Sequence, residues 1–81
     1  MTILDEIIEA HPEETFLTAD GLEDAVIGVD YNTMRLVYSV AKCIEITSKD
    51  MSVDDAIEYL EFNTFNAYVG EKTPIWVHDD F

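Results

Sequence analysis

The sequence predicts one small α+β domain that spans residues 1–81. The expected order is an N-terminal helix, a β-hairpin, two helices and a final strand, with the three strands forming an antiparallel sheet. Two segments carry apolar residues at helical spacing, and three short β-branched runs are bounded by turn residues. A chain of 81 residues that is 48% hydrophobic suits a single globular domain.

The first helix is expected over residues 2–10. Thr2 can cap it, and Asp5 completes an arrangement close to a capping box. Its apolar residues fall on one stripe: Ile3, Leu4, Ile7 and Ile8. Pro12 ends the helix, and residues 13–24 are expected to form a connection with a turn at its end.

A hairpin is expected next, with its first strand at 25–29. The region 33–48 fits two interpretations. Either a strand runs to about Tyr38 and is followed by a helix that Ser39 opens, or the whole region is one helix. The first interpretation is favoured, with the helix ending at about Ser48.

The third helix is expected over residues 53–66, because Ser52 and Asp55 have the spacing of a capping box. Its buried face would consist of Val53, Ala56, Ile57 and Leu60. Pro74 then leads into the last strand, 75–77, which is expected at a sheet edge because it begins directly after a proline.

The charge balance excludes several classes of function. Eighteen acidic residues oppose four basic ones, for a net charge of −14. Such a chain would repel phosphate, so direct binding to nucleic acid through counterion release is excluded and adsorption to anionic lipid is disfavoured. Apolar runs fall short of the ~20 residues that span a bilayer. The single cysteine, Cys43, permits no internal disulfide and fits the cytoplasm.

The sequence offers no catalytic, metal or cofactor site. The tail 78–80 could suggest a metal site, but its only other histidine partner is His11, so a solvated acidic tail is the simpler interpretation. Cys43 lies on an apolar stripe and is expected to be a buried, inert thiol. No glycine-rich phosphate loop occurs. We therefore expect a protein that is not an enzyme and needs no cofactor.

The stretch 61–76 reads EFNTFNAYVGEKTPIW. It resembles the tail of a group of small acidic proteins encoded by phages and prophages, and the segments 25–30 and 35–46 resemble the same group. The resemblance covers about two thirds of the chain, from residue 20 onward. It implies a role inside an infected bacterial cell, and it carries over no catalytic or binding residue.

Two functions follow as hypotheses. In the first, carboxylates imitate DNA phosphates and occupy the basic groove of a host nucleic-acid-binding protein, such as restriction, CRISPR or transcription machinery. The expected acidic face combines the first and third helices: Asp5, Glu6, Glu9, Glu13, Asp54, Glu58 and Glu61. An imitation of DNA requires that the carboxylates be concentrated on one face. Spread evenly over a protein surface of ~4,900 Å², each acid would have about 270 Å², whereas each phosphate of duplex DNA has about 107 Å².

The alternative is a small structural or assembly protein that forms a homodimer through aromatic residues. Tyr and Trp are enriched at interfaces, and a chain of this size has a marginal core. The residues expected on that surface are Tyr59, Phe62, Tyr68 and Trp76. The acidity would then serve only solubility or reflect a salty environment.

Overall fold

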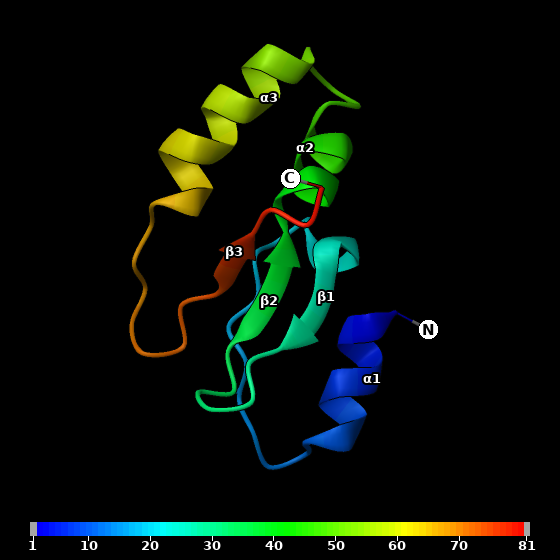
Figure 1. The fold of residues 1–81 in the computed structure, drawn as a ribbon, viewed down its shortest axis with the longest axis vertical. Coiled ribbons are helices and arrows are strands. Elements are labelled where there is room, and N and C mark those ends of the chain that lie inside the picture. Colours follow the sequence, from blue (N-terminus) through cyan, green and yellow to red (C-terminus); the bar gives the residue numbers. More distant parts are fainter. Residues whose placement is uncertain (1, 81) are drawn as a thin grey trace.

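The computed structural model describes residues 2–80 and shows a small α+β fold (Figure 1). Its helices are α1 (Ile3–Ala10), α2 (Val40–Thr47) and α3 (Val53–Leu60), and its strands are β1 (Val26–Val29), β2 (Leu36–Ser39) and β3 (Ile75–Val77). A short helical piece, η1 (Glu23–Ala25), was not predicted. The end of the helix predicted over 53–66 is a separate π-helical turn, η2 (Glu61–Phe65), so the order of elements differs from the expected one at these two places.

The sheet is mixed, and the prediction of an antiparallel sheet was wrong for one of its two strand pairs. β2 lies in the centre and pairs antiparallel with β1, from Val29 opposite Leu36. β2 pairs parallel with β3, with Val37 opposite Ile75. The reason is the path between these strands, because α2 leaves one end of β2 and α3 with η2 carries the chain back toward the other (Figure 1). Apolar periodicity defines strands but does not give their direction.

Side-chain caps define where the helices begin. Thr2 accepts a hydrogen bond from the Asp5 N–H at 3.1 Å, and Asp5 accepts one from the Thr2 N–H at 3.2 Å, which completes the capping box of α1. Ser39 ends β2 and caps α2 by accepting from the Lys42 N–H at 3.1 Å. The strand-then-helix interpretation of residues 33–48 is therefore confirmed.

The core lies between the sheet and the helices. α1 packs on β1 and α2 packs on α3. Tyr38 is fully buried at the centre, and its hydroxyl accepts a hydrogen bond from the Ala19 N–H at 2.8 Å, which attaches the connection 13–24 to the sheet. The ring of Trp76 packs on Tyr38 and on Phe65, with ring centroids 4.8 and 5.1 Å apart.

The π-helical turn η2 changes which residues face the core. Leu60 is 1% exposed and Phe65, five residues later, packs on Trp76. A spacing of five residues fits the wider turn of a π-helix, whereas a regular α-helix would place residues three or four apart on one face. Phe62, between them, is 86% exposed. The turn therefore brings the ring of Phe65 to the core side, whereas Phe62, two residues after Leu60, would face outward in a regular helix as well.

We expect the thiol of Cys43 to be unreactive in the folded protein. Cys43 is fully buried, and burial raises its pKa from the ordinary 9.0 to about 11. Dithionitrobenzoate at pH 8 should therefore label the denatured chain at once and the folded chain only slowly. Because the folded pKa is the higher one, the thiol's contribution to the free energy of unfolding should be complete below pH 9 and be lost as the pH rises toward 11. Rapid labelling of the folded chain would contradict this burial.

Candidate protein-binding surface

Nearly all carboxylates lie on the surface. Among the acidic residues, only Glu14 and Asp30 are half-buried, and the rest are exposed. Eighteen acids on 5464 Å² of accessible surface correspond to about 300 Å² per carboxylate. Duplex DNA has roughly 107 Å² per phosphate, if its charges are placed on a cylinder of about 10 Å radius. The mean charge density is thus well below that of DNA, and an imitation of DNA requires local concentration.

Two of the four basic side chains, Arg35 and Lys72, are half-buried and form contacts within the protein. The Lys72 ammonium contacts the Glu14 carboxylate at 3.3 Å and donates to the carbonyls of Thr33 and Met34 at 3.2 and 3.5 Å. Arg35 donates through Nε to the Thr73 carbonyl. Both cations are half-buried. They therefore hold the loop before β3 against the hairpin and neutralise little of the outer surface.

The other two cations, Lys42 and Lys49, are exposed on or just after α2, where they border a hollow shared with Asp24 and Glu45. Within residues 2–80, Lys42 and Lys49 are the only exposed lysine or arginine side chains. Within the same range, no carboxylate of α1 or α3 forms an ion pair with a lysine or arginine. A basic partner would be drawn toward the carboxylates of these two helices.

The structure does not bring the predicted acids of α1 and α3 together. Figure 1 places α3 and α1 at opposite ends of the long axis, with the sheet between them, in a molecule of 38 × 27 × 23 Å. One group follows α1 and the connection after it, namely Asp5, Glu6, Glu9 and Glu13, and the other lies on α3 and η2, namely Asp54, Glu58 and Glu61. All seven are exposed, but they form two acidic surfaces rather than one.

The surface on α3 combines charge with exposed aromatic rings. A shallow hollow of about 440 Å³ is lined by Asp55, Glu58, Tyr59, Phe62 and Asn63. Tyr59 is 50% and Phe62 86% exposed. We use the name α3 surface for this hollow together with its neighbours Asp54 and Glu61. Sequence reasoning missed Asp55 and Asn63, since Asp55 was assigned to helix capping. Acids at positions 54, 55, 58 and 61, spaced one, three and three residues apart beside aromatic residues, were the available signal.

Three of the four aromatic residues expected at a dimer interface are exposed. Tyr68 is 78% exposed, and Tyr59 and Phe62 belong to the α3 surface. Trp76 is placed differently, because its ring packs between Tyr38 and Phe65. A single tryptophan in a three-residue strand gives no indication of which side of the strand is covered. It contributes to the fold more than to an outer surface.

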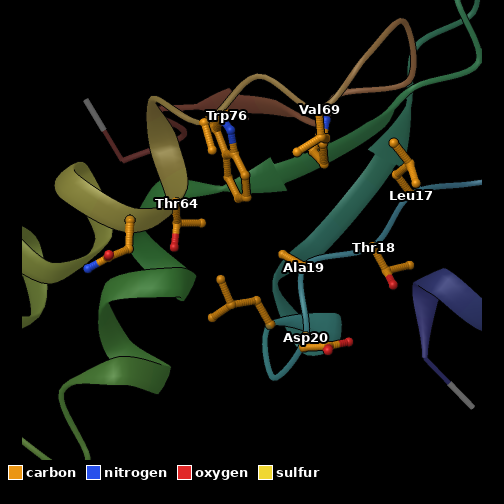
Figure 2. A pocket seen from close by; sticks show the side chains of 11 residues that line it. Leu17, Thr18, Ala19, Asp20, Thr64, Val69 and Trp76 are labelled. Atoms are coloured by element: carbon orange, nitrogen blue, oxygen red, sulfur yellow. The ribbon is translucent and has the colours of Figure 1, made fainter.

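A second concave feature is an apolar groove of about 340 Å³ beside β3 (Figure 2). Its walls come from the connection before β1, from η2 and its continuation, and from the chain leading into β3: Leu17, Thr18, Ala19, Asp20, Leu22, Asn63, Thr64, Ala67, Val69, Pro74 and Trp76. Figure 2 shows Trp76 and Val69 along one wall, Thr64 at one end and Leu17 and Ala19 opposite. Asp20 is its sole titratable lining residue, so it does not assemble acid–base chemistry.

The remaining polar contacts are structural. Asp79 accepts a hydrogen bond from the Ser39 hydroxyl at 2.6 Å, and His78 lies 4.0 Å from Asp80. Asp30 accepts from the Thr33 hydroxyl and N–H, which lowers the pKa of its carboxyl and closes the hairpin turn. Within residues 2–80, no group of three or more His, Cys, Asp or Glu side chains could hold a metal ion. In the same range, no helix has the length and apolar character to cross a bilayer.

A scan against models of known families, a search of curated proteins and a search of solved structures each gave no match to this chain. The resemblance to small phage proteins therefore stays a prediction.

Proposed function

We propose that this protein acts by binding another protein, and that its partner presents a basic groove that otherwise holds nucleic acid. The observation that carries the proposal is the α3 surface, where exposed carboxylates form no ion pair within residues 2–80 and line a hollow together with an exposed Phe62. On this proposal the protein is a phage-type inhibitor that works in the cytoplasm of a bacterial cell. It competes with DNA or RNA for a host nucleic-acid-binding protein.

The free carboxylates support this proposal. Within residues 2–80, the ion pairs are Lys72 with Glu14 and His78 with Asp80, so the acids of α3 have no ion-pair partner inside the chain. Asp54 and Glu58, and Glu58 and Glu61, stand at spacings where like charges cost a helix about 0.2–0.5 kcal/mol per pair. Asp54 interacts favourably with the dipole at the start of α3, but the repulsion with Glu58 and between Glu58 and Glu61 does not stabilise the fold, whereas a basic partner would be steered to these charges.

The proposal is tested with the immobilised protein and a bacterial lysate. We expect a DNA- or RNA-binding protein to be retained in 50 mM NaCl, lost in 500 mM NaCl and eluted competitively by duplex DNA or RNA, because the same basic groove serves both ligands. If no retained protein is displaced by nucleic acid, the proposal is wrong.

Two matched variants identify which acidic surface binds. One variant carries Asp54→Asn, Glu58→Gln and Glu61→Gln on α3, and the other carries Glu6→Gln, Glu9→Gln and Glu13→Gln at α1. Each removes three charges and leaves the Thr2–Asp5 capping box intact. We expect the α3 variant to retain at least tenfold less partner and the α1 variant to lose much less. Equal losses would indicate that total charge rather than the α3 surface drives binding.

The exposure of Phe62 and Tyr68 favours homodimer formation as a second candidate. Electrostatic repulsion disfavours such a dimer, because pairing two α3 surfaces would place the carboxylates of one copy against those of the other. Sedimentation equilibrium distinguishes the two. The main proposal expects a monomer whose mass is independent of concentration, whereas the dimer candidate expects a dimer that Phe62→Ala or Tyr68→Ala dissociates.

A further inference from the structure

We propose that the hollow on the α3 surface binds an arginine side chain of the partner. This inference rests on the proposed function and deepens it by naming the group that the surface recognises. The hollow places two carboxylates, of Asp55 and Glu58, beside two exposed rings, of Tyr59 and Phe62, with Asn63 at its edge. Together they make a site for a planar cation.

The groups that line the hollow are mostly acceptors. The Asp55 N–H donates to the Ser52 hydroxyl at 3.1 Å, but α3 has only this half of a capping box, so the Asp55 carboxylate is not bound back to the helix end as that of Asp5 is. The Asn63 amide nitrogen donates to the Tyr59 carbonyl at 3.1 Å, which leaves its side-chain oxygen as the free group. A ligand that offers several donors and positive charge fits this set.

The aromatic rings favour arginine over lysine. A guanidinium is planar, stacks on the face of an aromatic ring and can donate two parallel hydrogen bonds to one carboxylate. A lysine ammonium is a strongly hydrated point charge and makes neither arrangement as well. Basic grooves for nucleic acid commonly use arginine for phosphate contacts, so the partner class already proposed supplies the required side chain.

The position of Phe62 within a π-helical turn strengthens the inference. Phe62 lies in η2, two residues after the buried Leu60 and therefore on the opposite side of the helix, while η2 brings Phe65 onto the core side. π-helical turns occur frequently at functional sites. Phe62 at 86% exposed, held on a helical element and surrounded by charge, has the character of an interface anchor that becomes buried on binding.

The chain provides controls that separate the ring from the charge. Tyr31 is 90% exposed, but its neighbour Asp30 is already bound to Thr33, so Tyr31 is a ring without a free carboxylate. Glu6 and Glu9 on α1 are exposed carboxylates far from the rings of α3. Of Tyr31, the acids of α1 and the α3 hollow, only the α3 hollow combines an exposed aromatic ring with free carboxylates.

The test titrates the ¹⁵N-labelled protein with two blocked peptides, acetyl-Gly-Arg-Gly-Arg-Gly-amide and its lysine counterpart, followed by NMR. We expect amide shifts concentrated in residues 54–63 and an affinity for the arginine peptide at least threefold higher than for the lysine peptide. Phe62→Ala and Glu58→Gln should each weaken arginine binding about fivefold or more. Tyr31→Ala and Glu9→Gln should change it less than twofold.

Three results would overturn the inference: shifts spread equally over α1 and α3, equal binding of the two peptides, or equal losses for Phe62→Ala and Tyr31→Ala. Phe62 and Tyr31 are both exposed, so both variants are expected to fold, which a thermal unfolding curve checks. The failures are distinguishable. If the Phe62→Ala variant still retains in full a partner that nucleic acid displaces, the arginine site is rejected and the proposed function is kept. If the lysate contains no partner that nucleic acid displaces, the proposed function itself is rejected.

Discussion

Replacing Leu60 with alanine is expected to lower the free energy of unfolding by about 2–5 kcal/mol, as for other fully buried leucines. Leu60 is 1% exposed and belongs to the core cluster with Leu4, Leu36 and Tyr38. Alanine would leave a cavity where α3 passes into η2, and the packing of Phe65 against Trp76 would lose support. A domain of this size has a total stability of roughly 4–12 kcal/mol, so the variant should lie close to unfolding at 37 °C.

The matched control is Leu17→Ala, which makes the same chemical change at a leucine that is 38% exposed. We expect it to cost less than about 1 kcal/mol, because little apolar surface is removed from contact. Urea unfolding followed by circular dichroism measures the free energy of unfolding of both variants. Similar losses for the two variants would show that Leu60 is not a core residue, and would put the α3–η2 junction in doubt.

The helices and their starts could be predicted because their determinants are local. Thr2, Ser39 and Ser52 each cap a helix within three residues. Of the predicted apolar stripe of α1, Leu4 and Ile7 are buried, whereas Ile3 and Ile8 are exposed. The direction of β3 could not be predicted, since it depends on where α2 and α3 carry the chain. The turn η2 was also missed, because an i to i+5 pattern differs from the helical period by one residue.

The candidate site could be predicted only in part for the same reason. Spacing on one helix correctly groups Asp54, Glu58 and Glu61, because residues three and four apart are neighbours. Whether α1 joins them is a question of tertiary arrangement, and the two helices lie at opposite ends of the molecule (Figure 1). The packed position of Trp76 is likewise set by two rings from distant parts of the chain, Tyr38 and Phe65.

Replacing Lys72 with methionine is expected to lower the free energy of unfolding by about 1–3 kcal/mol, the range for hydrogen bonds that involve a charged group. Its ammonium joins three segments: the Glu14 carboxylate after α1, the carbonyls of Thr33 and Met34 in the hairpin turn, and its own loop before β3. Methionine retains an apolar stem of similar length but has no donors, so these carbonyls would lose their partner.

Lys49→Met is the control, because it makes the same change in net charge at an exposed lysine whose side chain forms no hydrogen bond or ion pair within residues 2–80. If Lys72 mattered only as a positive charge on a strongly acidic protein, both variants would lose equal stability, and 0.5 M NaCl would restore both by screening the surface. We expect instead that Lys49→Met stays within about 0.5 kcal/mol and that salt leaves most of the Lys72→Met loss in place. Such a result would mean that the chain's few cations serve internal contacts, which leaves the carboxylates of α3 free for a partner.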